Sequence, residues 1–314
     1  MPVLPASFSS ATISRIAFAN VVANGAIVVT GGVVRLTGSG LGCPTFPKCT
    51  DDSLTTTPEM GLHGVIEFGN RLLTFVVSAV ALALLVAVWR SARRDLRPLA
   101  VAAFLGIPAQ AAIGGVTVLT GLNPWTVMTH FLVSTVLIAI ATVLWLRSRE
   151  PGTGQPLLRR PLVLLVRGIA AVTAAVLVLG TLVTGSGPHS GDVDANDVPT
   201  GDRMGFDLEL ISQLHADAVF LLLGLTIALL VALHATDSPG RVRRAARDLL
   251  IVELAQGVIG YVQYFTGLPV VLVLLHMLGA VLITVYAARL VWSVRGPSSD
   301  APLTSAARPV TAAR

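Results

Sequence analysis

Hydrophobic positions gather in eight long runs separated by short polar segments. The runs lie near residues 16–34, 65–89, 99–119, 127–147, 161–183, 211–234, 248–265 and 270–293. A helix needs about 20 residues to cross the roughly 30 Å of hydrocarbon in a bilayer. Helices also satisfy their own backbone hydrogen bonds, which lipid cannot do. The pattern therefore predicts an all-α membrane protein of eight transmembrane helices.

Composition agrees with the bilayer as solvent. Hydrophobic residues make up 54% of the 314 residues and charged residues only 12%, whereas about a quarter of a typical soluble domain is charged. A soluble globular class is therefore excluded. The final segment, 297–314, is rich in Pro, Ser, Ala and Arg, and we expect it to be a disordered cytoplasmic tail.

The charged residues predict an orientation. Arginines cluster in the segments 90–97, 147–160 and 241–247, whereas Asp and Glu gather in the segments 35–64 and 184–210. Arginine-rich loops stay in the cytoplasm, so both termini of this multi-pass chain are predicted to be cytoplasmic. The pI near 10 then follows from topology. It does not indicate nucleic-acid binding, because the basic residues occupy short loops rather than one folded face.

An internal repeat divides the chain into two similar units. The sequence Thr-Gly-Ser-Gly at 37–40 recurs at 184–187, and Thr-Gly-Leu at 120–122 recurs at 266–268. Gln110 and His130 recur as Gln256 and His276, each 146 residues later. Four spans return the chain to its starting side, so the copies have the same orientation, as in parallel repeats. We therefore expect an N-terminal four-helix bundle over 1–150 and a C-terminal one over 151–296.

Histidines occupy corresponding places in these units. His130, His215 and His276 fall in the outer parts of three predicted spans, and the repeat puts Asn70 in the fourth place. Polar groups inside spans usually face a protein interior or a cofactor, and imidazole is a common axial ligand of heme iron. The alternative is that each histidine bonds a backbone carbonyl of a neighbouring helix. A zinc site would need more ligands close together.

Glu67 is a second unusual residue, because it is a carboxylate inside a predicted span. It lies three residues before Asn70, hence on the same helical face. Such a group beside a substrate could act as an acid, a base or an electrostatic stabiliser. The alternatives are a salt bridge with Arg71 and an interfacial carboxylate that reaches toward water.

Cys43 and Cys49 lie in the first predicted outer loop, six residues apart and with two prolines between them. On the oxidising side of a membrane, this spacing favours a disulfide. The disulfide would either staple the loop or serve in thiol exchange or in shaping a pocket lid.

Several motifs together resemble those of the heme A synthase family. They are Arg-Leu-Thr-Gly-Ser-Gly-Leu-Gly-Cys-Pro at 35–44, Ile-Glu-Phe-Gly-Asn-Arg at 66–71, the segment 114–124 with His130, and the segment 184–192. The resemblance runs through all eight predicted spans. It implies an oxidoreductase of the bacterial cell membrane that oxidises the C8 methyl of heme O to a formyl group, which gives heme A for cytochrome oxidase. It also implies a substrate heme in the N-terminal bundle and heme b in the C-terminal one.

The resemblance implies roles for individual residues. His215 and His276 would ligate heme b, and His130 would ligate the substrate heme. Glu67 would be the catalytic carboxylate beside that substrate. Cys43 and Cys49 match the family's outer-loop disulfide.

The chain departs from the family at Asn70, where the common pattern has histidine. Asn70 could bond a heme-bound water, or the iron could be five-coordinate through His130. Arg35 and Arg71 are candidate contacts for heme propionates, although arginines at helix ends also simply reach toward water.

The implied partners are the heme O substrate, membrane lipid, heme O synthase, cytochrome oxidase assembly factors and an electron donor that the sequence does not specify. Competing interpretations are a di-heme b-type membrane electron-transfer protein that exchanges electrons with quinone, a thiol-disulfide enzyme and a transporter built on the parallel repeat. Asn70 speaks against the di-heme protein, and the lack of further cysteines speaks against the thiol-disulfide enzyme.

Overall fold

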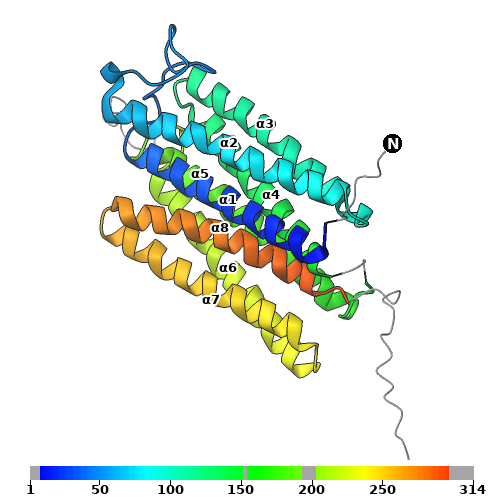
Figure 1. Ribbon diagram of the computed structural model, residues 1–314. Coiled ribbons are helices and arrows are strands. Elements are labelled where there is room, and N and C mark those ends of the chain that lie inside the picture. The colour runs from blue at the N-terminus through cyan, green and yellow to red at the C-terminus, as the bar shows by residue number, and fades with distance from the viewer. Residues whose placement is uncertain (1–7, 151–153, 193–202, 297–314) are drawn as a thin grey trace, which may run out of the picture.

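The computed structural model describes residues 8–150, 154–192 and 203–296, in which eight long α-helices lie side by side (Figure 1). The helices are α1 Ser10–Leu36, α2 Gly61–Trp89, α3 Arg97–Leu119, α4 Pro124–Arg149, α5 Arg160–Ser186, α6 Leu208–Ala235, α7 Gly240–Phe265 and α8 Val270–Ser293. Two short 3-10 helices, η1 Pro58–Met60 and η2 Arg94–Leu96, lead into α2 and α3. The all-α prediction is confirmed. The predicted tail at 297–314 lies outside the described residues.

The helices extend beyond the predicted apolar runs at their charged ends. The clearest case is α7, which begins at Gly240 rather than near residue 248, because arginine is a good helix former even where it is too polar for hydrocarbon. In the described ranges, seven of the eight helices are long and apolar enough to cross a membrane, and α7 falls short. Its polar side chains include Glu253 and Gln256, but α7 still packs along α6 and α8.

Each half of the chain forms a four-helix bundle. In the first half, α1 contacts α2 and α4, and α3 contacts the same two helices. In the second half, α6 contacts α5 and α7, and α8 contacts the same two helices. A large apolar core runs through the second bundle, with Leu229, Leu249 and Leu290 fully buried in it.

The two bundles meet along α1, α4, α5 and α8. Contacts join α8 to α1 and to α4, and α4 to α5. Val28, Ile138 and Val281 from three of these helices form one buried cluster across the boundary. The halves therefore make one continuous helical body, and the division at residues 150 and 151 into functional units stays a prediction.

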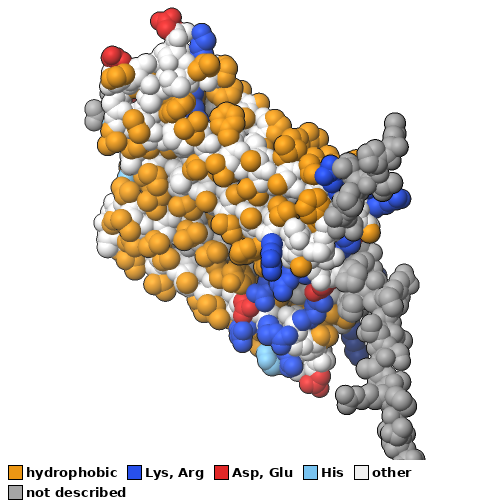
Figure 2. Space-filling model, in the orientation of Figure 1, with side chains coloured by type: hydrophobic (Ala, Val, Ile, Leu, Met, Phe, Trp, Pro, Cys, Tyr) orange, Lys and Arg blue, Asp and Glu red, His pale blue; other side chains and the backbone are white. Residues whose placement is uncertain are grey.

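The surface is apolar around its middle. Figure 2 shows hydrophobic side chains over most of the visible face, with Lys and Arg gathered mainly at one end. Large apolar side chains such as Phe75 (72% exposed) and Phe265 (76% exposed) point outward. This is the arrangement of a multi-pass membrane protein, whose outer side chains face lipid. The side of the membrane on which the termini lie stays a prediction.

The repeated Thr-Gly-Leu motif forms the same turn in both bundles. Gly121 and Leu122 have φ values of 60° and 57°, and Gly267 and Leu268 have values of 76° and 59°. Both turns follow a helix end closed by backbone hydrogen bonds. Consecutive left-handed residues reverse the chain in few residues, so α4 and α8 begin at matching places. His130 and His276 are each the seventh residue of their helices.

The loops from the two bundles meet at one end of the molecule, which we call the disulfide end. The backbone N–H of Gly40 donates a 2.8 Å hydrogen bond to the carbonyl of Gly191. Arg35 donates to the carbonyls of His189 (2.8 Å) and Thr184 (2.9 Å). The segment between α1 and α2 is thereby fixed against the second bundle. We call the opposite end, which carries Arg90–Arg97 and the start of α7, the arginine-rich end.

Candidate functional site

Two histidines face each other in the second bundle. His215 lies on α6 and His276 on α8, with ring centroids 6.5 Å apart and ring planes at 71°. Both side chains are half-buried. The structure therefore brings together the pair that the sequence placed at one depth in the membrane.

Each of the three span histidines lies against a glycine of the preceding helix. The pairs, with the distance from a Cβ built on the glycine to the imidazole Cε1, are Gly114 and His130 at 3.2 Å, Gly180 and His215 at 3.1 Å, and Gly260 and His276 at 3.2 Å. Such a Cβ would crowd the ring, and small residues are what allow close approach between membrane helices. The repeated pairing shows that the three imidazoles occupy equivalent places.

Asn70 occupies the fourth place, on α2. The hydroxyl of Thr30 on α1 donates a 2.7 Å hydrogen bond to Oδ1 of Asn70, and a Cβ at Gly31 would lie 3.8 Å from Asn70 Nδ2. A glycine thus lies beside this position as well. No hydrogen bond joins Asn70 to His130 among the described residues.

Two glutamines hold the histidine-bearing helices. The side-chain amide of Gln256 donates a 2.6 Å hydrogen bond to the backbone carbonyl of His276. Its counterpart Gln110 donates a 2.9 Å hydrogen bond to the carbonyl of His130 and also bonds the hydroxyl of Ser134. Each amide fixes the turn that carries an imidazole.

The paired imidazoles fit a heme. A bond between a metal and an imidazole nitrogen is about 2 Å long and the ring centroid lies roughly 1 Å beyond that nitrogen, so two rings on opposite faces of one iron have centroids about 6 Å apart. The buried Nδ1 atoms of His130 and His276 have no hydrogen-bond partner in the described ranges. No three His, Cys, Asp or Glu side chains gather there as metal ligands would. Two imidazoles without further protein ligands suit a metal that carries its own equatorial ligands.

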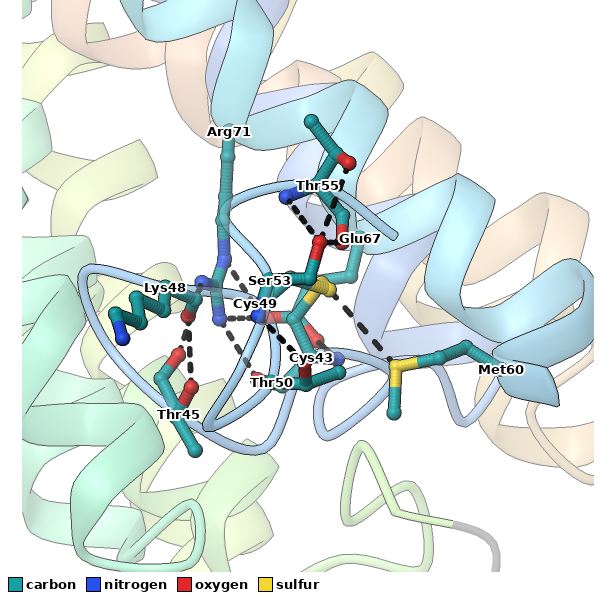
Figure 3. Close-up of a disulfide and its surroundings, with 10 residues drawn as sticks. All are labelled: Cys43, Thr45, Lys48, Cys49, Thr50, Ser53, Thr55, Met60, Glu67 and Arg71. Carbon is teal, nitrogen blue, oxygen red and sulfur yellow. Dashed lines mark hydrogen bonds and ion pairs between the residues drawn. A yellow bond between two sulfur atoms is a disulfide. The ribbon is translucent and has the colours of Figure 1, made fainter. Parts of the chain in front are cut away.

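Glu67 is held by the disulfide loop and by Arg71 (Figure 3). Its Oε2 accepts a 2.6 Å hydrogen bond from the backbone N–H of Cys43. Its Oε1 accepts from Arg71 at 2.5 Å and 3.1 Å. The side chain is buried, with 5% of the residue exposed. The ion pair with Arg71 that the sequence left open is therefore present, and the catalytic role of Glu67 stays a prediction.

Cys43 and Cys49 form the predicted disulfide. Arg71 also donates to the carbonyls of Cys43, Thr45 and Lys48, so one guanidinium holds three points of the ring that the disulfide closes. Within that ring, Phe46 packs against Gly115 of α3, where a Cβ would clash with its phenyl ring. Gly115 follows the glycine that contacts His130, so the loop lies close to the His130 site.

The two arginines proposed as propionate contacts have protein partners. Arg71 donates hydrogen bonds to carbonyls of the disulfide loop. Arg35 donates hydrogen bonds to the carbonyls of Thr184 and His189 in the second bundle. Their role toward propionates stays a prediction. His63, near the start of α2, bonds the hydroxyl of Ser39 at 2.9 Å and is exposed.

Sequence reasoning missed the roles of the glutamines and glycines around the imidazoles. Gln110 and Gln256 were visible as a repeated pair, and Gly114 and Gly260 lie in the same register. That recurrence was the available signal. Gly180 carried none, because the 147-residue offset of the Thr-Gly-Ser-Gly repeat takes it to Val33 rather than to a glycine.

Known proteins provide an independent comparison. A family model described as "Cytochrome oxidase assembly protein" (COX15-CtaA) matches residues 14–288. The chain is similar to proteins named heme A synthase from Lysinibacillus sphaericus (38% identical over 125 residues), Bacillus pumilus (33% over 124) and Listeria welshimeri (31% over 121). Each alignment covers 38% of this chain and 39% of the relative. The family model spans most of the chain, from α1 to α8, and the chain therefore belongs to the COX15-CtaA family of cytochrome oxidase assembly proteins.

Proposed function

We propose that this protein is a heme A synthase that oxidises the C8 methyl of heme O to a formyl group. The observation that carries this proposal is the inequality of two otherwise equivalent sites. One bundle has facing imidazoles on His215 and His276, whereas the other has a single imidazole on His130 and an amide on Asn70 at the corresponding place. An electron carrier with two hemes needs two iron sites that each have a protein ligand on both faces. An oxidising enzyme instead needs an iron with one face left without a protein ligand.

In this proposal the C-terminal bundle holds a resident heme b between His215 and His276. The 6.5 Å separation of their ring centroids supports this assignment. Heme b would supply one-electron transfer. Gln256 fixes the turn of His276, while Gly180 and Gly260 leave room for the imidazoles.

The N-terminal bundle would bind the substrate, heme O, through His130. Gly114 leaves room for the ring, and Gln110 fixes its turn. Asn70 would face the other side of the iron as a hydrogen-bonding group, held by Thr30. Glu67 would lie beside the reacting methyl. The pair with Arg71 favours the ionised form of Glu67, the form in which a carboxylate can act as a base or as an electrostatic stabiliser.

The remaining assignments follow from this function. The units 1–150 and 151–296 would be the substrate half and the heme b half. The enzyme would lie in the bacterial cell membrane with both termini in the cytoplasm, so that the disulfide end faces the oxidising side. It would receive heme O from heme O synthase and act with cytochrome oxidase assembly factors and an electron donor.

One expression experiment tests the proposal. The chain is produced in a host that makes heme O but not heme A, and the extracted hemes are identified by mass. We expect heme A with the wild type and none with His130→Ala. A purified protein that holds two low-spin hemes and yields no heme A would instead identify the di-heme electron carrier.

A further inference from the structure

A buried carboxyl group lies deep in the second bundle, away from the histidines. Glu253 on α7 is only 2% exposed. Its Oε1 accepts a 3.0 Å hydrogen bond from the hydroxyl of Thr226 on α6. Its Oε2 is buried and has no hydrogen-bond partner among the described residues. Such an arrangement inside a membrane bundle is costly and marks a functional group.

The repeat shows that the fold does not need this polar pair. His215 corresponds to Asn70, 145 residues earlier, and the same offset takes Thr226 to Ala81. Gln256 corresponds to Gln110, 146 residues earlier, and that offset takes Glu253 to Ile107. Ala81 and Ile107 are both buried in one apolar cluster. The equivalent contact is thus apolar in the first bundle and polar in the second.

Among the described residues, no cation is paired with Glu253. The titratable or charged side chains on the helices that pack against α7 are Glu209, His215, Asp217 and His234 on α6, and His276, Tyr286 and Arg289 on α8. None of them is hydrogen-bonded or ion-paired to Glu253 in the described ranges. Arg289 instead pairs with Asp248 of α7 at 2.8 Å. An ionised Glu253 would therefore be an unpaired charge in the bundle interior.

Arg247 and Arg289 are both paired with Asp248, so the histidine pair is the remaining place on these helices where we look for a compensating positive charge. Glu253 lies seven residues before Gly260, the glycine that contacts His276, which is about 10 Å along the helix. Two unit charges on the order of 10 Å apart at an effective dielectric constant of about 20 interact strongly enough to change a binding constant roughly tenfold. An iron between His215 and His276 would therefore affect proton binding at Glu253.

We propose that Glu253 is a proton-binding site coupled to the redox state of the iron held by His215 and His276. When an external one-electron donor reduces that iron from Fe³⁺ to Fe²⁺, the Glu253 carboxylate takes up one proton from water and becomes a neutral carboxylic acid. Reoxidation releases the proton. The unpartnered Oε2 receives it, and Thr226 holds Oε1. This inference rests on the proposed heme in the second bundle.

The test is a redox titration of the purified heme-containing protein, with dithionite as reductant, at a series of pH values. The midpoint potential of the C-terminal heme should fall as pH rises over one window in the wild type. Its total change should correspond to about a tenfold change in equilibrium constant, or roughly 59 mV for one electron. Glu253→Gln should remove this dependence. Thr226→Val keeps the carboxyl group of Glu253. This variant should shift the pH range over which the midpoint potential changes, without removing the change.

Glu209→Gln is the matched control. Glu209 is an exposed carboxylate on α6, six residues before His215, hence about 9 Å along the helix. Solvent screens its charge, so this variant should keep the wild-type pH dependence. Redox-difference infrared spectra give a second readout. The carbonyl band of a protonated carboxyl should grow on reduction of the wild type and of Glu209→Gln, and should be absent in Glu253→Gln.

A wild-type potential that does not change with pH, or a Glu253→Gln protein with the wild-type dependence, overturns the inference. If Glu253→Gln does not fold, the infrared band of the wild type and its change in Thr226→Val decide the question. Failure of the proposed heme site would give a different result, because the heme absorption spectrum would then be unchanged by His215→Ala.

Discussion

The side-chain amide of Gln256 on α7 donates a 2.6 Å hydrogen bond to the backbone carbonyl of His276 on α8. The same bond joins Gln110 to His130 in the first bundle. Both histidines are the seventh residue of a helix that follows the same left-handed turn, so the glutamine and the turn together set the height and rotation of the imidazole.

Replacing Gln256 with leucine should weaken heme retention in the second bundle. Loss of one interhelical hydrogen bond costs about 1 kcal/mol, which corresponds to roughly fivefold weaker binding. The ratio of heme to protein after purification, with reduced-minus-oxidised absorption spectra, measures the effect. Gln263→Leu is the control, because Gln263 lies on the same helix and its side-chain oxygen has no partner in the described structure. Equal retention in both variants would contradict a positioning role for Gln256.

Glycines beside the imidazoles permit a sharper test. Gly260→Val would push a side chain into the ring of His276, since even a Cβ would lie 3.2 Å from Cε1. We expect loss of most heme from the second bundle, by tenfold or more. Gly257→Val is the matched control on the same helix, because a Cβ at Gly257 meets nothing within 4 Å.

Gly114→Val makes the corresponding change beside His130. It should abolish heme A formation while the absorption spectrum of the C-terminal heme is preserved. Gly260→Val and Gly114→Val therefore test the two bundles separately, the first by heme retention and the second by heme A formation. Loss of both signals in either variant would mean that the bundles do not bind their hemes independently.

The sequence predicts most of the fold because the bilayer imposes a simple pattern of apolar runs. The repeat then identifies His130, His215 and His276 as equivalent places without any structure. The sequence offered Arg71 as one partner of Glu67, but the hydrogen bond from the backbone N–H of Cys43 could not be predicted, because it depends on how the ring closed by Cys43 and Cys49 folds back onto α2. Helix α7 begins before its predicted apolar run, because hydropathy ends a run at the first arginine, while helical hydrogen bonding continues through it.

The contacts of Glu67 allow its charge and its structural role to be separated. Glu67→Gln keeps an oxygen that can accept the N–H of Cys43 but loses the charge. If Glu67 is catalytic, this variant should make no heme A and should keep the C-terminal heme. Normal heme A from Glu67→Gln, with none from Glu67→Ala, would show that Glu67 only anchors the loop.

Removal of Arg71 should damage the same region by another route. Arg71→Leu leaves Glu67 buried without its cation and frees the carbonyls of the disulfide loop, which should cost about 3 kcal/mol of stability. Thermal unfolding in detergent measures this loss. Arg247→Leu breaks an ion pair whose arginine side chain is 61% exposed and should cost less than about 1 kcal/mol. Similar losses in the two variants would argue against a structural role for the Glu67 pair.

Asn70 allows a direct test of why the first bundle differs from the second. Gly31 lies beside Asn70, where a Cβ would already be in contact with Asn70 Nδ2 at 3.8 Å; because glycine has no Cβ, a larger imidazole at position 70 has room, as the other three imidazoles have beside their glycines. Asn70→His should therefore give a second iron site with two histidine ligands, seen as additional low-spin heme in absorption and electron paramagnetic resonance spectra. A closed iron face should also slow the oxidation of heme O. Thr30→Val is the control, because it releases the amide of Asn70 without adding a ligand, and it should add no low-spin signal. If Asn70→His adds no low-spin heme, then position 70 does not face the iron and the proposed open site is wrong.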